Sequence, residues 1–338
     1  MRFIATLKAH SLPNMKTSRK GSCMNVLKGC SRLVKPASLA VALALAASFA
    51  TKAAETCQTF ATPEEAVAAL VQATSAQSGA DLRAIFGPAA ADLQNPDRVQ
   101  ATNEFNAFTA NLKVTNRLVR ESDLKCVLEV GTNFWPIPVP IVKQAARWFF
   151  DTEAGKEEIL SRRIGKNELS ALQAVRAYVD AQREYASRDR NGDEVLEYAQ
   201  RIASTPGTKD GLFWPPDLDG EISPLGPLVA EAQGAGYDMK GRGSSTSREP
   251  FHGYYFKILT RQGKHAPGGK YDYIINGHMI GGFSLVAWPA EYEESGIMTF
   301  IVNQQGRVYQ RDLGPKTGKL AAAMKVYDPD SSWSVSPD

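Results

Sequence analysis

The residues with the clearest capacity for chemistry lie in the last quarter of the chain, where glycines interrupt short apolar runs. Three of the four histidines occur there, His252, His265 and His278, and the acids Glu291 and Glu294 follow. A carboxylate within reach of an imidazole can perform general acid–base chemistry. Pairs formed by Glu291 or Glu294 with His265 or His278 are therefore candidate catalytic groups of a hydrolase. The alternative is a solvated acidic turn with separate histidines.

Two basic groups are candidate anion-binding residues. Lys264 and Lys270 lie in the glycine-rich segment GKHAPGGK, which is not a phosphate-binding loop because Tyr271 stands where such a loop requires Ser or Thr. The pair Arg162 and Arg163 is predicted to lie on a helix. These two arginines could bind an anion or form structural ion pairs with neighbouring glutamates.

The sequence predicts no metal site and no cofactor. The histidines lack the short spacing of zinc ligands and have no cysteine beside them. The run Asp189–Asp193 (DRNGD) is similar to the start of a calcium-binding EF-hand loop. Such a loop requires glycine where Glu194 stands and glutamate where Gln200 stands. A turn followed by a helix over Glu194–Ile202 is favoured, and a looser calcium site is the alternative.

The first 50 residues have the features of a secretory signal peptide. They contain eight Lys or Arg and no Asp or Glu, and the run Ala37–Ala50 is apolar with small residues at its end. This run is shorter than the roughly 20 apolar residues that cross a bilayer. We therefore expect cleavage, export to the periplasm and no membrane span in the mature protein; a retained membrane anchor is the alternative. The true start could be Met1, Met15 or Met24.

Removing this leader changes the charge of the protein. It leaves 31 basic and 36 acidic residues, a net charge of −5 in place of +3. A mildly acidic protein lacks the basic surface that binds nucleic acid, so no nucleic-acid partner is expected. Cys57 and Cys126 remain in a compartment that permits disulfides. Two alternatives stay open, a disulfide between them or two unpaired thiols.

The pattern predicts an α+β protein whose N-terminal domain covers residues 55–200. Thr62, Pro63 and Glu65 form the start of its first helix, with a capping threonine and a glutamate three residues later. Helices followed by an antiparallel sheet are similar in order to cystatin-like proteins. The expected later elements are helices at 80–86, 98–112 and 154–187, the last with a break near Gly165, and strands at 114–120, 125–130, 137–142 and 146–150.

A C-terminal β-rich domain is predicted at residues 251–330, after a linker region at 201–250 that contains one helix at 227–233. Its alternating apolar runs and glycine-rich breaks are typical of an antiparallel meander. The expected strands are 254–261, 270–275, 282–288, 297–303 and 307–312, followed by a closing helix at 317–326. The aromatic residues Trp148, Trp214, Trp288 and Tyr292 are expected in the core, and a groove lined by them is the alternative.

Several long motifs resemble a bacterial family of exported proteins known as domain of unknown function 2950. They are GYYFKILT, GKHAPGGKYDYIINGHMIGGF, LVAWPAEYEESGIMTFIVN and GRVYQRDLGPKT, with RRIGKNEL and KDGLFWP in the first half. The resemblance covers nearly all of the predicted mature chain and implies export without a known activity. The C-terminal part is also similar to pilins and pseudopilins, although the long N-terminal assembly helix of those proteins is missing.

These observations lead to two expectations about function. The first is a non-enzymatic binding or interaction module of the cell envelope, accessory to envelope assembly or secretion, with an envelope protein or a small molecule as its partner. The second is a periplasmic hydrolase that uses a carboxylate and a histidine.

Overall fold

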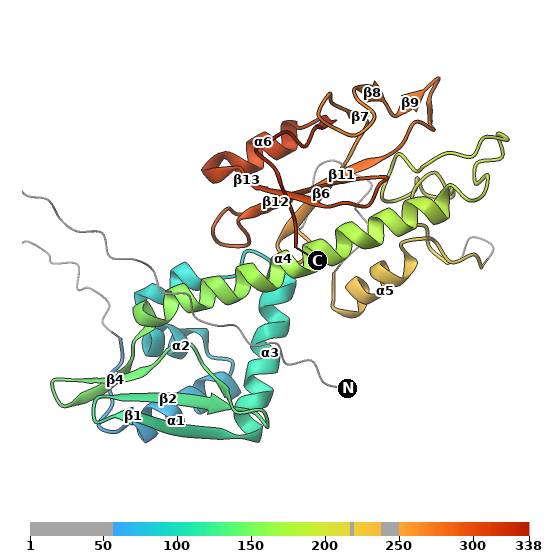
Figure 1. Cartoon of the computed structure of the whole chain (residues 1–338). Coiled ribbons are helices and arrows are strands. Elements are labelled where there is room, and N and C mark those ends of the chain that lie inside the picture. Colours follow the sequence, from blue (N-terminus) through green and yellow to red (C-terminus); the bar gives the residue numbers. More distant parts are fainter. Residues whose placement is uncertain (1–56, 217–219, 238–249, 338) are drawn as a thin grey trace, which may run out of the picture. The chain divides into compact units, whose positions relative to one another are not determined.

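The computed structural model describes residues 57–216, 220–237 and 250–337; the predicted signal peptide lies outside this part of the chain. The structure confirms the α+β class (Figure 1). Its α-helices are α1 (Pro63–Ser75), α2 (Gly79–Phe86), α3 (Arg98–Val114), α4 (Thr152–Tyr185), α5 (Gly226–Gly234) and α6 (Thr317–Ala323), and its 3₁₀ helices are η1 (Pro88–Leu93) and η2 (Gly314–Lys316). None of these helices combines the length and the apolar composition needed to cross a membrane.

The described strands form two larger sheets and two smaller ones. In the N-terminal sheet, the order is β1-β2-β4-β5 with β3 on β2, and in the C-terminal sheet it is β15-β13-β12-β11-β6. A three-stranded sheet has the order β14-β7-β8, and β9 pairs with β10. The bounds are β1 (Asn116–Ser122), β2 (Lys125–Val130), β3 (Trp135–Pro136), β4 (Ile141–Gln144), β5 (Arg147–Phe150), β6 (Tyr254–Leu259), β7 (Arg261–Gln262), β8 (Tyr271–Asp272), β9 (Ile274–Ile275), β10 (His278–Met279), β11 (Ser284–Pro289), β12 (Met298–Asn303), β13 (Tyr309–Asp312), β14 (Val326–Tyr327) and β15 (Ser334–Val335).

The start of α1 confirms the predicted cap. The hydroxyl of Thr62 accepts a hydrogen bond from the N–H of Glu65 (3.2 Å), and the Glu65 carboxylate accepts one from the N–H of Ala61 (3.0 Å). The buried side of α1 then packs with residues of β2, β4 and β5 in one apolar cluster. The predicted strand at 137–142 is shorter than expected and begins only at Ile141. The alternating prolines explain this, since proline has no N–H for a ladder.

Helix α4 connects the two larger sheets, as Figure 1 shows. Its first half contributes Ile159 to the cluster of the N-terminal sheet, and its second half contributes Val175 and Tyr178 to the cluster of the C-terminal sheet. The break expected near Gly165 is wrong, because the helix continues over 34 residues. A glycine inside a helix weakens it by only about 1 kcal/mol, which packing along the rest of α4 can offset.

The C-terminal sheet is covered on both faces. Val286 and Ile301 share an apolar cluster with Ala321 of α6, whereas Leu285 and Phe300 share one with the second half of α4. Every residue of β11 is buried. Successive side chains of a strand point to opposite faces, so the apolar run that follows Ser284 in β11 agrees with this two-sided burial.

The region after α4 also belongs to the cluster packed on the second half of α4. Leu212, Trp214, Leu225 and Val229 are buried there beside residues of β11 and β12. The predicted helix at 227–233 is confirmed as α5. The predicted division into an N-terminal domain, a linker and a C-terminal domain stays a prediction.

Charged groups surround Trp214 at the edge of this cluster. The guanidinium of Arg190 lies 5.3 Å and the ammonium of Lys209 lies 5.4 Å from the centroid of the indole ring. Both groups pair with the carboxylate of Glu221, Lys209 at 2.5 Å and Arg190 at hydrogen-bond distance. The hydrogen bond from Lys209, followed by the contributions of Arg190, lowers the pKa of Glu221.

This lowered pKa predicts an acid-dependent loss of stability that Glu221→Gln removes. A carboxylate whose pKa is lower in the folded state stabilises the protein above its unfolded-state pKa, about 4.3 for glutamate, and less as the pH falls through the folded-state value. Because Glu221 is partly exposed, Glu221→Gln should cost about 1 kcal/mol at pH 7. Urea unfolding at pH 7 and pH 3 should show this difference shrinking at the lower pH. An equal difference at both values would contradict the ion-pair explanation.

Candidate functional site

A tight loop at Asp189–Asp193 follows the end of α4. The Asp189 carboxylate accepts hydrogen bonds from the N–H groups of Gly192 and Glu194, each at 2.8 Å. Glu194 has a φ of +65°, a left-handed conformation that usually favours glycine. The backbone hydrogen bonds, the one from Glu194 first, lower the pKa of Asp189. The ionised form of Asp189 therefore stabilises this loop.

The helix predicted at Glu194–Ile202 is wrong, because this segment is non-helical. Its N–H groups bond to distant residues: that of Tyr198 donates to the carbonyl of Met279 (2.9 Å), and that of Ala199 donates to the side chain of Gln182 (2.8 Å). A helix would need these donors for carbonyls four residues earlier. The long-range hydrogen bonds therefore hold the segment extended against β10 and α4.

A two-residue turn presents His278 to this segment. Asn276 and Gly277 have φ values of +52° and +92°, and they join Ile275 to His278, which are paired across β9 and β10. An Asn-Gly pair between apolar residues is a strong hairpin signal. The prediction of a single strand at 270–275 does not take this Asn-Gly signal into account. In the structure, β8 and β9 occupy that segment.

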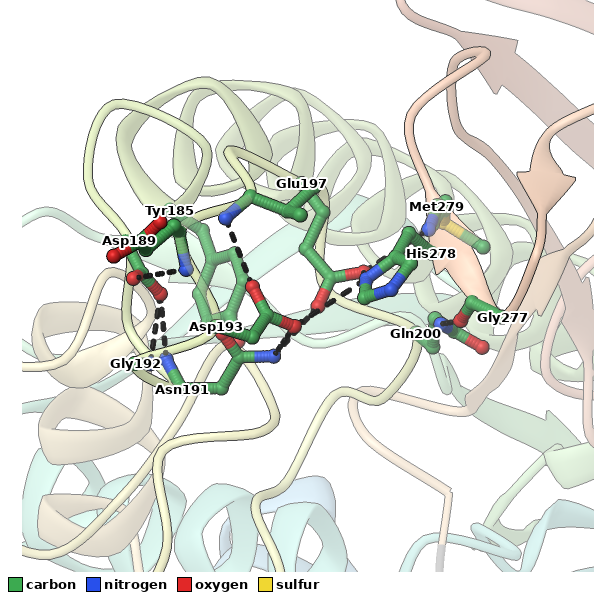
Figure 2. A network of polar contacts seen from close by, with 12 residues as sticks. Tyr185, Asp189, Asn191, Gly192, Asp193, Glu197, Gln200, Gly277, His278 and Met279 are labelled. Atoms are coloured by element: carbon green, nitrogen blue, oxygen red, sulfur yellow. Dashed lines mark hydrogen bonds and ion pairs between the residues drawn. The ribbon is translucent and has the colours of Figure 1, made fainter.

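The cluster of Asp193, Glu197 and His278, referred to below as the His278 cluster, is drawn in Figure 2. Nδ1 of His278 lies 3.4 Å from a carboxylate oxygen of Asp193 and 3.4 Å from one of Glu197. One donor atom from each residue lies within 4.8 Å of the other two. The amide of Asn191 donates to Asp193 (2.7 Å) and to Glu197 (3.0 Å), so it holds the two carboxylates side by side. An imidazole between two carboxylates can bind a metal ion or exchange a proton.

The predicted pairs of Glu291 or Glu294 with a histidine do not form in the described part of the chain. His265 pairs with Asp328, with 3.0 Å between Nδ1 and the carboxylate. His278 lies with Asp193 and Glu197 in the cluster just described. The structure therefore places His278 beside Asp193 and Glu197 rather than beside the glutamates with which the sequence paired it.

The loops that hold these candidates leave opposite ends of the C-terminal sheet. The segment Gly263–Lys270 comes after the end of β6, where Leu259 pairs with Ser284. The acidic segment with Glu291 and Glu294 comes after the end of β11, where Pro289 pairs with Tyr254. The register of the sheet thus gives no support for one ligand site formed by both loops.

The predicted anion-binding arginines have structural partners. Arg162 pairs with Glu158 at 2.7 Å, one helical turn away. Arg163 is buried and donates to the backbone carbonyls of Leu93, the last residue of η1, and of Gln94. Burial lowers the pKa of the Arg163 guanidinium. These contacts correspond to the structural alternative for both arginines.

The predicted anion-binding lysines, Lys264 and Lys270, are exposed in a hairpin tip. Gln262 holds this tip by donating to the carbonyls of Pro267 (2.8 Å) and Gly269 (2.7 Å). Their role as anion ligands stays a prediction.

Among the residues that the structure describes, Cys57 and Cys126 are free thiols. Cys57 donates to the carbonyl of Phe86 at 3.6 Å, and Cys126 is buried in β2. Burial raises the pKa of each thiol and so disfavours the reactive thiolate. This arrangement corresponds to the second alternative, two unpaired thiols.

An apolar pocket, called here the α4–β6 pocket, is lined in part by residues that closely follow Glu197 of the His278 cluster in the chain. Its volume is about 410 Å³. It is bounded by α4, α5, β6 and the segment 200–203, with lining residues Ala174, Tyr178, Gln200, Arg201, Ile202, Ala203, Phe213, Leu225, Leu228, Val229, Ala232, Phe251, Tyr254, Tyr255, Phe256, Lys257, Ile258 and Leu285. Small-molecule sites usually have volumes of roughly 300–1,000 Å³ and mainly apolar walls.

Three polar side chains of the pocket wall form hydrogen bonds with the protein itself. The hydroxyl of Tyr178 donates to the carbonyl of Ser284 (3.2 Å), and that of Tyr254 donates to the carbonyl of Met298 (2.9 Å). The ammonium of Lys257 donates to the carbonyl of Ala322 at 2.6 Å. The wall is therefore suited to an apolar surface rather than to a strongly charged group.

A second hollow between α1 and β1 is larger but more open, at about 640 Å³. The part of its lining that comes from α1 includes the polar residues Glu64, Gln72 and Ser75. Its openness to solvent makes it a weaker candidate for holding a small molecule than the α4–β6 pocket.

Comparisons with known proteins agree with the resemblance of the motifs. The profile of the family described as "Protein of unknown function (DUF2950)" matches residues 57–335. No curated protein and no solved structure gives a match. The match includes both the His278 cluster and the α4–β6 pocket. With a profile match over most of its length, the chain belongs to the DUF2950 family.

Proposed function

We propose that the protein is an exported, non-enzymatic binding protein of the cell envelope that holds a small and mainly apolar molecule in the α4–β6 pocket. The pocket itself carries this proposal: about 410 Å³ of space lined largely by aromatic and aliphatic side chains. An aromatic ring system or a short acyl chain has the matching chemistry. Burial of such a ligand contributes roughly 25 cal/mol per Å² of apolar surface.

The buried tyrosines of the pocket wall support binding without catalysis. Tyr178 and Tyr254 are buried, and burial raises the pKa of each hydroxyl, which keeps both neutral at physiological pH. Their hydrogen bonds to backbone carbonyls orient the rings and leave the ring faces as an apolar wall. A ligand in this place would meet rigid aromatic surface from two elements, α4 and β6.

The leader supports the envelope location, because its basic start and short apolar run have the layout of a signal peptide. A role as an accessory of envelope assembly or secretion agrees with an exported protein that binds without transforming its ligand. The alternative of a periplasmic hydrolase would require a carboxylate–histidine pair in a cleft, and the pairs proposed for it from the sequence are not formed in the described residues.

Filling the pocket should abolish ligand binding. In the variant Ala232→Phe, a ring replaces a buried methyl group in the pocket wall, whereas Ala230→Phe places the same ring on the exposed side of α5. We expect the neutral fluorescent probe N-phenyl-1-naphthylamine to bind the wild type and Ala230→Phe alike. Its Kd should rise at least tenfold in Ala232→Phe, a loss of about 1.4 kcal/mol.

Circular dichroism and thermal unfolding would establish that Ala232→Phe is folded, with Ala232→Leu as a smaller substitution if it is not. Lack of binding by the wild type, or equal binding by both phenylalanine variants, would contradict the proposed site. Mass spectrometry of organic extracts from protein purified out of its own envelope would then identify the natural ligand.

A further inference from the structure

We infer that Asp193, Glu197 and His278 bind one divalent metal ion of the zinc class, which fastens the segment after α4 to the β9–β10 hairpin. The ligands come from two parts of the chain that are more than 80 positions apart, and the fold brings them together. This metal site does not depend on the proposed function, although its effect on the pocket, described below, does.

Two of the donor-atom distances in the His278 cluster match a metal-centred arrangement. Metal–ligand bonds of 2.0–2.2 Å in a tetrahedral site place neighbouring donor atoms about 3.3–3.6 Å apart. Nδ1 of His278 lies 3.4 Å from Oδ2 of Asp193 and 3.4 Å from Oε2 of Glu197. Three donors on one side leave further positions for water or another ligand.

The imidazole nitrogen at the centre of the cluster has no hydrogen bond. Nδ1 of His278 is buried, and neither carboxylate meets hydrogen-bond geometry with it. A buried polar atom without a partner costs free energy, so it calls for an explanation. The nitrogen faces two carboxylates but is aligned with neither. A metal ion between the three groups would satisfy all of them at once.

The charges of the cluster also favour a cation. In the part of the chain that the structure describes, neither Asp193 nor Glu197 forms an ion pair with a lysine or an arginine. The hydrogen-bond donors to these two carboxylates within the described residues are neutral amides. They are the side chain of Asn191 and the N–H groups of Val195 and Met279. Two neighbouring carboxylates repel each other unless a positive charge lies between them.

The donor types select the kind of ion. Spacing alone would also suit Ca²⁺, whose longer bonds in an octahedral site give similar separations of about 3.4 Å. Calcium and magnesium, however, take oxygen ligands, whereas an imidazole nitrogen with carboxylates suits zinc and neighbouring transition metals. The imidazole therefore assigns the site to Zn²⁺-class ions rather than to the calcium of an EF-hand.

An ion in this place would act on one wall of the α4–β6 pocket. Three residues after Glu197, Gln200 lines that pocket and donates to the carbonyl of Gly277, the neighbour of His278 (2.6 Å). The N–H of Tyr198 donates to Met279 (2.9 Å), so the segment already follows the hairpin. A metal ion would strengthen this connection between the segment and the hairpin. The functional meaning of that effect rests on the proposed pocket.

Titration of metal-free protein tests the site. The protein, purified without a histidine tag and stripped with a chelator, is titrated with Zn²⁺, Mn²⁺ and Ca²⁺ by calorimetry and native mass spectrometry. We expect one equivalent of Zn²⁺ to bind and to raise the Tm. Affinity should fall at least tenfold in His278→Ala and in Asp193→Asn, but stay unchanged in His265→Ala, a matched control whose histidine faces a single carboxylate.

Circular dichroism of the metal-free variants would separate loss of the site from loss of the fold. The inference is overturned if no Zn²⁺ binds the wild type, if Zn²⁺ binding survives in His278→Ala, or if only Ca²⁺ binds and does so independently of His278. If metal-free protein still binds the fluorescent probe, the pocket forms without the ion. If the protein binds Zn²⁺ but not the probe, the proposed pocket is contradicted and the metal site is not.

Discussion

Replacing Asp97 with alanine should lower the free energy of unfolding by about 4 kcal/mol. The Asp97 side chain is buried, and it accepts three hydrogen bonds from different parts of the fold. One oxygen accepts from the N–H of Gln100 (2.9 Å) and so caps α3. The other accepts from the hydroxyl of Tyr237 (2.6 Å) and from the N–H of Gly253 (3.2 Å).

The size of this effect follows from the donors that alanine would leave without an acceptor. A hydrogen bond to a charged group contributes about 1.5–3 kcal/mol, and the loss of an N-cap costs about 1 kcal/mol. Asp97 also connects the start of α3 to the chain just before β6, which raises the number of contacts that depend on it. The contributions overlap, so the total stays below their sum.

Urea unfolding of Asp97→Ala and Tyr237→Phe measures this prediction. Tyr237→Phe removes one hydroxyl but keeps the ring, which packs edge-on against Phe251 at 5.2 Å between centroids. It should cost about 1–2 kcal/mol. A loss below 2 kcal/mol for Asp97→Ala, or the same loss in both variants, would show that the carboxylate does not organise this junction.

Asp97 also marks a limit of inference from the sequence. The helix that it caps was predicted at 98–112 from its apolar positions, and the structure has it at Arg98–Val114. The other partners of Asp97 lie 140 and 156 positions away. No local pattern relates residues at such separations, so the carboxylate could not be identified as a tertiary contact.

The same physical reason separates the correct predictions from the wrong ones. The start of α1 depends on Thr62 and Pro63, and α5 has Pro227 in its first turn, so both starts were predictable from a short window of sequence. The segment 194–202 depends on Met279 and Gln182, and its helix prediction was wrong. Local rules failed where long-range hydrogen bonds took the backbone donors.

The candidate site shows this contrast within a few residues. The sequence indicated a turn at Asp189–Asp193 and made His278 a candidate residue, each with a chemical rationale. Their meeting in space was not apparent, because it depends on the Asn276-Gly277 turn and on the path of the chain after α4. The sequence therefore paired His278 with Glu291 or Glu294, whereas the structure places it beside Asp193 and Glu197.

Replacing Trp214 with alanine is expected to cost about 3–5 kcal/mol, the range for deleting a large buried aromatic side chain. Trp214 is 1% exposed and belongs to the cluster packed on α4. Its Nε1 donates to the carbonyl of Glu221 (3.1 Å), and two cations lie against its ring. Alanine would leave a cavity and remove the ring that Arg190 and Lys209 contact.

The variant Trp214→Phe separates the ring from its N–H group. It keeps an aromatic surface and loses one hydrogen bond, so it should cost about 1–2 kcal/mol in the same urea titration. Trp214 also follows Phe213, whose N–H donates to the carbonyl of Ile202 (2.9 Å) in the wall of the α4–β6 pocket. Trp214→Ala should therefore weaken N-phenyl-1-naphthylamine binding under conditions where it is still folded, while Trp214→Phe retains it. Equal losses of stability in the two variants would mean that the N–H, and not the ring, supports this wall.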